Sequence, residues 1–165
     1  MAGIRLAHDA DRRSLARLRH ALWPEGSLAE HERELEQIFD GTWSRIHPYV
    51  VFVSESASGE IVGFAEVSVR SRADGCDPSR PVGYLEGWYV SETDRRRGIG
   101  AELLQAAEEW ARAQGCVEMA SDTWIDNEIS QRAHEMLGFE VVDRCVNYKK
   151  RLDSAGPRAR SPRAG

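Results

Sequence analysis

The sequence predicts a single α/β domain in which helices cover both faces of a mixed sheet. Two observations carry this prediction. After a short strand and two helices, apolar residues recur with strand and helix periods in the order ββ-loop-β-helix-β-helix-ββ. At 165 residues with 41% hydrophobic and 30% charged positions, the chain can bury one sizeable core but is short for two. We expect one domain over residues 1–152 and a tail over 153–165.

The N-terminal part predicts a strand and two helices. Residues 3–7 alternate apolar and polar positions, as in a short strand. Leucines repeat at helical spacing within residues 10–22, and Pro24 ends this helix. The run SLAE at residues 27–30 fits a capping box, so a second helix begins there and ends at Gly41.

The middle of the chain predicts three strands. Residues 49–53 are β-branched or aromatic, a turn follows at 57–60, and strand-like composition resumes over 61–69. These two strands form a hairpin. A loop rich in glycine, proline and aspartate spans residues 73–81 and leads into a further strand over 82–90.

The C-terminal part predicts two helices and three strands. A long amphipathic helix ends at Gly115, and the short apolar run 116–120 is typical of a buried strand. A second helix covers residues 128–137. Residues 139–142 and 145–148 then favour a closing pair of strands.

Composition excludes several classes of protein. The net charge of −5 argues against general binding to nucleic acid and suits a cationic substrate. No run approaches the roughly 20 apolar residues that span a bilayer. The three cysteines are far apart and show no C-x-x-C spacing, so we expect a cytoplasmic protein without disulfides or bound metal. The tail over 153–165 is basic and lacks apolar periodicity, which favours a disordered terminus over a nucleic-acid contact.

The most specific motif lies over residues 90–104, where a strand end, a basic turn and a helix start follow one another. Gly98 and Gly100 let the backbone approach a ligand closely. Successive N–H groups and the helix dipole favour an anion at such a helix start. A lone G-x-G is a weak signal, but the strand before it and the long helix after it favour a diphosphate site.

These residues resemble a known family. The run LEGWYV at 85–90, followed by R-x-x-G-x-G at 95–100, is similar to the acetyl-CoA pyrophosphate loop of the GCN5-related N-acetyltransferase (GNAT) superfamily. Asn127 and the LGF at 137–139 resemble the second signature helix of that family. The resemblance implies a mixed, mostly antiparallel sheet that splays between the fourth and fifth strands.

A narrower resemblance covers most of residues 4–152. Short segments in the right order are similar to the aminoglycoside 6′-N-acetyltransferases of Gram-negative bacteria. They include LWP at 22–24, GCD at 75–77, YLEG at 84–87, EMASDT at 118–123 and ISQ at 129–131.

The resemblance implies acetyl-CoA as co-substrate and direct transfer to a bound amine, without an acyl-enzyme. The pantetheine arm would lie beside the backbone of Tyr89 and Val90 like an added strand, and Asn127 would reach its cysteamine end. Backbone amides of the basic turn would bind the diphosphate. These belong to Arg95, Arg96, Arg97, Gly98, Ile99, Gly100 and Ala101.

Two acidic residues at neighbouring strand ends, Glu86 and Asp122, are the candidates for chemistry. A substrate ammonium must lose a proton before it attacks a thioester, and a carboxylate can accept that proton. The resemblance places both residues in the substrate site, with Asp122 binding and deprotonating the amine. The alternatives are an Asx turn at Asp122 and a solvated strand position at Glu86.

Three further residues are candidates for the site. His134 stands where many relatives carry a tyrosine that protonates the leaving thiolate; an imidazole can do the same, or it can pack on the helix. Trp23 and Trp88 can wall a sugar site because aromatic faces suit sugar rings and cations. The stretch before GCD, in which close relatives carry a tyrosine, holds Arg70 and Arg72 here, and these arginines would repel a polycation.

The sequence therefore predicts an N-acetyltransferase that modifies the 6′-amine of aminoglycosides and so confers resistance. Alternatives are an acetyltransferase for a polyamine, amino acid or peptide amine, and an acyl-CoA-binding module without turnover. We expect a homodimer that forms through the closing strands over 139–151.

Overall fold

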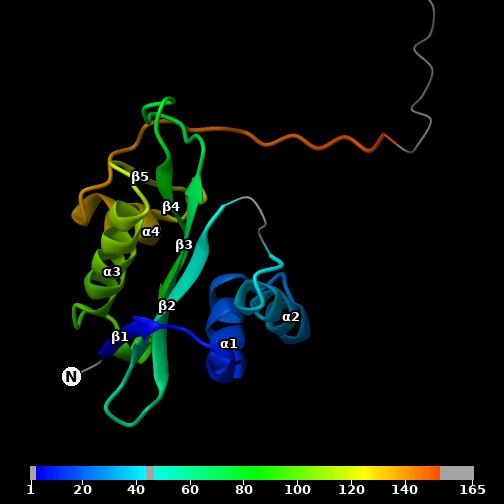
Figure 1. Ribbon diagram of the computed structural model, residues 1–165, viewed down its shortest axis with the longest axis vertical. Coiled ribbons are helices and arrows are strands. Elements are labelled where there is room, and N and C mark those ends of the chain that lie inside the picture. The colour runs from blue at the N-terminus through cyan, green and yellow to red at the C-terminus, as the bar shows by residue number, and fades with distance from the viewer. Residues whose placement is uncertain (1–2, 44–46, 153–165) are drawn as a thin grey trace, which may run out of the picture.

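The computed structural model describes residues 3–43 and 47–152, and its centre is a five-stranded sheet (Figure 1). The strands lie in chain order, with β1 to β4 antiparallel and β5 parallel to β4. The predicted mixed, mostly antiparallel α/β sheet is confirmed. The strands are β1 Gly3–Leu6, β2 Tyr49–Glu55, β3 Ile61–Arg70, β4 Val82–Val90 and β5 Met119–Ser121.

Helices cover both faces of this sheet, as Figure 1 shows. The pair α1 and α2 packs on one face, and α3 packs on the other with α4 beside it. The helices are α1 Arg12–Leu22, α2 Leu28–Phe39, α3 Ile99–Ala113 and α4 Glu128–Met136. Each matches a helix that the sequence predicts.

Local signals in the sequence explain where α2 begins and ends. Ser27 accepts a hydrogen bond from the N–H of Glu30, and the Glu30 carboxylate accepts one from the N–H of Ser27. This capping box satisfies donors that the first turn leaves free. The chain leaves the helix through Gly41, whose φ of +76° lies in the left-handed region that favours glycine.

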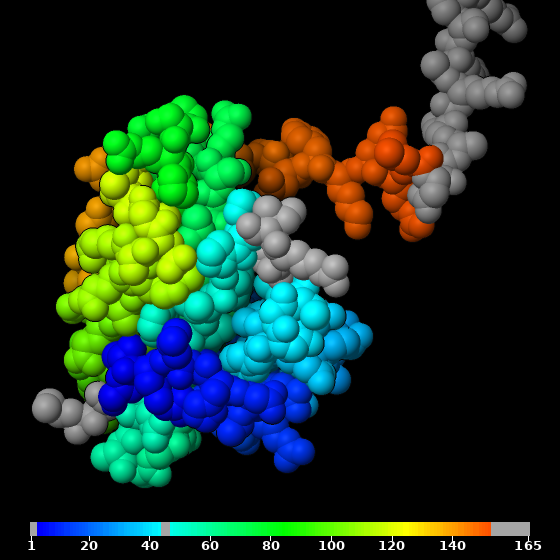
Figure 2. Space-filling model, in the orientation of Figure 1, coloured from blue at the N-terminus to red at the C-terminus, as the bar shows by residue number. Residues whose placement is uncertain are grey.

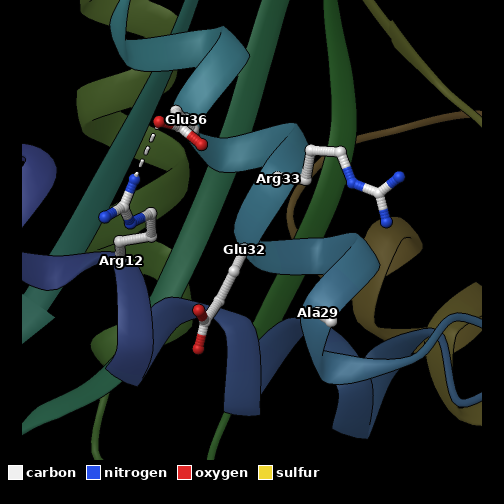
Figure 3. Close-up of a pocket in the computed structure, with 5 residues that line it drawn as sticks. All are labelled: Arg12, Ala29, Glu32, Arg33 and Glu36. Carbon is white, nitrogen blue, oxygen red and sulfur yellow. Dashed lines mark ion pairs between the residues drawn. The ribbon is translucent and has the colours of Figure 1, made fainter.

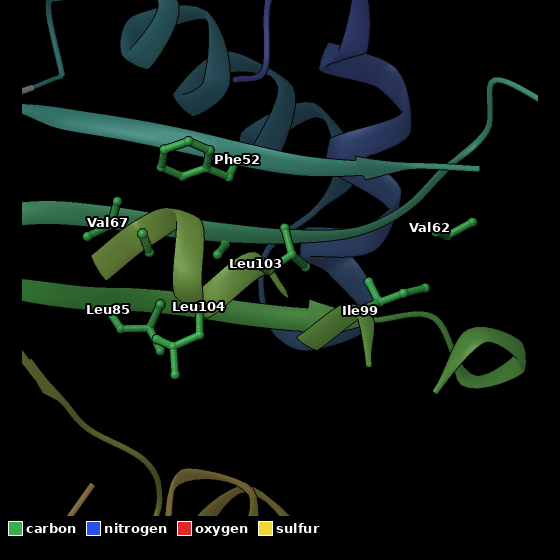
Figure 4. Packing of buried hydrophobic residues seen from close by; sticks show 9 residues of the cluster. Phe52, Val62, Val67, Leu85, Ile99, Leu103 and Leu104 are labelled. Atoms are coloured by element: carbon green, nitrogen blue, oxygen red, sulfur yellow. The ribbon is translucent and has the colours of Figure 1, made fainter. Parts of the chain in front are cut away.

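The core has two main layers, one on each face of the sheet. Figure 4 shows the layer beneath α3, where Leu103 and Leu104 meet Phe52, Val67 and Leu85. A second layer joins α1 and α2 to the other face through Leu15, Leu35, Val53 and Phe64. Alternation along each strand therefore decides on which face a side chain lies.

The sheet splays between β4 and β5, as predicted. The two strands pair only from Gly83–Met119 to Leu85–Ser121. Beyond Leu85, β4 continues to Val90 with no strand beside it on this edge within the described residues. The backbone of residues 86–90 is thus available to an extended ligand.

The predicted closing strands over 139–142 and 145–148 are wrong. Residues 138–152 form no regular element. Phe139 packs against the core beneath α3 and Val142 lies against Gly75, and the chain then leaves the body of the protein, as Figures 1 and 2 show. Val146 and Tyr148 are 74% and 93% exposed. β-branched residues form a strand only where a partner edge accepts their hydrogen bonds, and none lies beside this segment in the described part of the chain. The predicted tail over 153–165 lies outside the described residues.

Candidate active site

The turn between β4 and α3 presents a group of backbone N–H donors. Arg96 and Gly98 have φ values of 63° and +84°, and this left-handed pair reverses the chain before α3 begins. A non-glycine residue in this region is uncommon. Among the described residues, the amides of residues 96–98 donate to no protein atom. Such a concave run of N–H groups, placed at a helix N-terminus, suits an anion.

Two of the three arginines in this turn hold it in shape. Nε of Arg95 donates to the carbonyl of Val90 at 3.1 Å, and the guanidinium of Arg97 pairs with Asp94 at 3.0 Å. Arg96 is exposed. The arginines therefore shape the loop and make it positive, while the backbone offers the directed donors.

Gly100 is needed for packing as well as for ligand access. A Cβ at this position would lie 2.7 Å from Cζ2 of Trp88, so only glycine lets the start of α3 sit on the indole. The indole N–H of Trp88 is buried without a partner. Trp88 belongs to the α3 face of the sheet, which is the face opposite Glu86.

A β-bulge sets the direction of Glu86. Glu66 pairs with Gly87 and Val67 pairs with Leu85, which leaves Glu86 as an extra residue in β4. The bulge turns the Glu86 carboxylate to the α1–α2 face, where Oε1 accepts a hydrogen bond from Ser68 at 2.5 Å. Bulges commonly redirect side chains beside active sites.

Asp122 reaches the same face from β5. It follows directly after Ser121, where the pairing with β4 ends. Tyr84 donates its hydroxyl hydrogen to Oδ1 of Asp122 at 2.6 Å. Burial and this hydrogen bond raise the pKa of Tyr84 far above its usual value, so the hydroxyl remains a donor. The structure thus brings the two predicted carboxylates to one face beside the splay.

Arg70 lies between these two acidic residues. Its guanidinium binds Glu86 through two contacts, Nε to Oε1 at 3.0 Å and Nη2 to Oε2 at 2.6 Å. The same guanidinium lies 3.3 Å from the ring centre of Tyr84. The sequence showed that position 70 is cationic but not that it contacts Glu86, because the contact depends on the β3–β4 register.

A second buried network supports this face, and sequence reasoning missed it. Glu66 is fully buried, with Nε of Arg19 3.0 Å from Oε1 and the hydroxyl of Tyr49 donating to Oε2. Burial raises the pKa of Glu66, and the charge of Arg19 opposes that rise. The signal was a single glutamate within the apolar run of β3, whose alternation turns residue 66 toward α1.

The two candidate tryptophans lie on opposite faces of β4. The tip of Trp23 packs on Gly87, where an added Cβ would lie 2.3 Å from Cη2. It also contacts Phe64 and lies beneath the guanidinium of Arg19. Trp23 therefore shares the face of Glu86, whereas Trp88 supports the anion-binding turn.

His134 lies next to Trp88 with both ring nitrogens engaged. Nδ1 is 2.7 Å from the carbonyl of Ser130, and Nε2 is 2.9 Å from the hydroxyl of Ser121. The ring also meets Trp88 edge-on, with 5.7 Å between ring centres. The Ser121 hydroxyl also donates to the carbonyl of Leu85 at 3.1 Å, so a chain of polar contacts links His134 to β4.

Asn127 acts as the N-cap of α4, since its Oδ1 accepts a hydrogen bond from the N–H of Ser130 at 3.1 Å. Its side-chain NH₂ is left to donate elsewhere. The residue is exposed at the start of α4.

A hollow of about 360 Å³ lies over α1 and α2, lined by charged residues that include the ion pair Arg12–Glu36 (Figure 3), away from Glu86 and Asp122. No group of three or more metal-ligating side chains gathers within residues 3–43 and 47–152. Burial, with the charges of Glu118 and Asp74, raises the pKa of Cys76, which disfavours a nucleophilic thiolate. In the same ranges no helix has the length and apolar character to cross a membrane.

Comparison with known proteins agrees with this geometry. The Acetyltransferase (GNAT) family model matches residues 14–139. Aminoglycoside N(6′)-acetyltransferase type 1 of Klebsiella aerogenes is 40% identical over 149 residues, covering 90% of this chain and 96% of the relative. The enzyme of the same name from Serratia marcescens is 43% identical over 136 residues, covering 82% and 89%.

A solved structure is also similar to this chain. AAC(6′)-Iy in complex with the bisubstrate analog CoA-S-monomethyl-acetylneamine superposes with a TM-score of 0.81 at 36% identity. The match covers 92% of this chain and 99% of that one. Family model, sequence relatives and solved structure thus agree, and the chain belongs to the acetyltransferase (GNAT) family.

Proposed function

We propose that the protein transfers the acetyl group of acetyl-CoA to the 6′-amine of an aminoglycoside, directly between two substrates bound together. The convergence of Glu86 and Asp122 on one face, beside the splay, is the observation that carries the proposal. The names of the relatives and the CoA-based ligand of AAC(6′)-Iy support the same substrate pair.

The turn and the splay fit acetyl-CoA. The free amides of residues 96–98 and the N-terminus of α3 bind the diphosphate, with Ala101 at the third position of the helix. The unpaired edge of β4 at Tyr89 and Val90 accepts the pantetheine arm as an added strand. Asn127 donates its side-chain NH₂ toward the cysteamine end.

The chemical step needs a base and a leaving group. Asp122 accepts a proton from the substrate ammonium, and the hydrogen bond from Tyr84 holds the carboxylate in place. The neutral amine then attacks the acetyl carbonyl, so that a C–N bond forms, the C–S bond breaks, and the new amide nitrogen releases its second proton to water. His134 donates a proton to the departing thiolate. Acetylation removes one positive charge from the antibiotic, which accounts for resistance.

The remaining positive charges of the substrate face Glu86, and Trp23 forms the apolar wall beside it. Trp88 lies on the other face and serves the cofactor side. This division separates the two tryptophans that the sequence grouped together.

The protein acts as a homodimer in the cytoplasm. Residues 138–152 carry exposed apolar side chains, among them Val142 at 62% and Val146 at 74%. Such a segment can pair with an edge of a second copy. The free thiols of Cys76, Cys116 and Cys145 suit a reducing compartment.

A panel of amines tests the function. CoA release is measured with acetyl-CoA and, in turn, kanamycin, tobramycin, spermidine, lysine and a lysine peptide. Selective turnover of the aminoglycosides, with acetyl found on the 6′-amine by NMR, supports the proposal. Turnover of spermidine or lysine alone would replace the substrate class, and CoA binding without any turnover would leave a binding module.

A further inference from the structure

Arg70 binds the carboxylate of Glu86, the group to which the proposed function assigns a positive charge of the substrate. It is the last residue of β3, on the same face as Ser68, and it binds both oxygens of Glu86. Ser68 donates to Oε1 as well. A carboxylate offers about four acceptor positions, so three are already used in the free protein.

The position of the guanidinium also affects Asp122. Arg70 stacks on the Tyr84 ring, and Tyr84 is hydrogen-bonded to Asp122, so one cation faces both acidic residues of the site. The planar fork of arginine matches a carboxylate better than an ammonium does. With Arg70 in place, the two carboxylates leave a net charge that balances one ammonium.

We propose that Arg70 is a specificity-determining residue whose guanidinium takes, at Glu86, the place of a second substrate ammonium. An amine with several charges binds fully only after Arg70 leaves Glu86, whereas an amine with one charge binds at Asp122 without displacing it. Arg70 is 42% exposed, which leaves its side chain room to swing into solvent. The inference rests on the proposed function, because it assumes that Glu86 receives a substrate cation.

The test compares two substrates and four variants. Kanamycin carries several ammonium groups, and methyl 6-amino-6-deoxyglucoside carries only the reacting one. Arg70→Met removes the positive charge and keeps a long side chain. Arg70→Lys keeps the charge but lacks the planar guanidinium that binds both oxygens of Glu86. Arg72→Met is the matched control, because Arg72 is exposed two residues further along the chain and makes no contact with Glu86 in the described structure.

At low ionic strength, Arg70→Met should lower the KM for kanamycin at least tenfold, with kcat changed less than about twofold. The KM for the monoamine should change less than about twofold. Arg70→Lys should give an intermediate KM, and Arg72→Met should leave KM within about twofold. Adding Glu86→Gln to Arg70→Met should remove the gain. Thermal melting confirms that each variant is folded.

Failure of the inference and failure of the function give different results. If the parent acetylates kanamycin and Arg70→Met leaves its KM unchanged, the role of Arg70 is refuted while the function stands. An equal fall of KM in Arg72→Met refutes it too, because general charge then explains the effect. If only Arg70→Met acetylates kanamycin, the role of Arg70 holds and the natural substrate is a less charged amine. No acetylation of either substrate by any variant overturns both proposals.

Discussion

Tyr84 donates its hydroxyl hydrogen to Asp122 at 2.6 Å, one residue beyond the point where β4 and β5 cease to pair. The bond joins the two strands at the start of the splay. Asp122 itself is exposed, so Tyr84 is the contact that holds its carboxylate in one orientation.

Replacing Tyr84 by phenylalanine therefore tests orientation without removing the carboxylate. Tyr84→Phe should lower kcat about tenfold and leave acetyl-CoA affinity unchanged, since a misplaced base is a poorer proton acceptor. Steady-state kinetics and calorimetry with CoA measure the two effects. Tyr89→Phe serves as the control for loss of a hydroxyl on the same strand, and an equal loss of kcat there would contradict the role given to Tyr84.

A negative charge at the start of α3 should repel the diphosphate without unfolding the helix. Ala101 is exposed at the third position of α3. The negative charge of an aspartate there would interact favourably with the helix dipole. Ala101→Asp should therefore raise or keep the melting temperature while acetyl-CoA binds at least tenfold more weakly, about 1.4 kcal/mol. Gly100 is unsuitable for this test because a side chain there would strike Trp88.

Ala101→Ser is the neutral control and should bind acetyl-CoA nearly as the parent does. Unchanged affinity in Ala101→Asp would mean that the diphosphate lies elsewhere.

The ion pair between Arg5 and Asp11 should make stability depend on pH. The hydrogen bonds from Arg5 hold the pKa of Asp11 below its usual range, against the effect of burial, and the N–H of His8 adds to them. A lowered folded-state pKa gives stability that is present above the unfolded pKa, about 3.9, and is lost as the pH falls through the folded value.

Asp11→Asn should therefore lower the free energy of unfolding by about 1–3 kcal/mol at pH 7, and by less as the pH falls below 4. Urea unfolding at several pH values measures the difference. Asp9→Asn, at an exposed neighbouring carboxylate, should cost less than about 0.5 kcal/mol. A constant difference for Asp11→Asn across the acid range would show that charge plays no part.

The exposed segment over 138–152 should form the dimer interface. Analytical ultracentrifugation at micromolar concentration should give twice the chain mass. Val146→Glu should weaken association at least tenfold, because a charge would replace an apolar side chain that the second copy covers. Asn147→Glu places the same charge on the opposite side of an extended segment and should leave the dimer intact. A monomeric parent protein would remove this interface.

The sequence predicts a helix or strand well where local signals mark both of its ends. The strand predicted over 82–90 matches β4, because a Gly/Pro loop precedes it and a basic turn follows. The prediction of the two closing strands was wrong because the sequence holds no signal for the strand edge that would pair with them. Their apolar alternation states which side chains could be buried but not which edge would pair with them.

The site shows the same limit. Asp122 could be chosen because it follows an apolar strand, and Glu86 because it is an acidic residue within the apolar run 82–90. Glu86 lies inside β4 and not at its end, and the structure brings both carboxylates to one face. The bulge at Glu86 could not be foreseen, since it depends on the register of β3 against β4. For that reason Trp88, two residues from Glu86 in the chain, lies on the other face of the sheet.

The most direct test of the account is steady-state acetylation of kanamycin and tobramycin by the parent protein, Asp122→Asn and Glu86→Gln, with acetyl-CoA affinity measured separately. The parent should acetylate both antibiotics. Asp122→Asn should lower kcat on the order of 10²-fold, and Glu86→Gln should mainly raise KM, with acetyl-CoA affinity unchanged in both. Parent-level turnover by Asp122→Asn would contradict the assignment of the base, and a parent protein that acetylates no aminoglycoside would contradict the account as a whole.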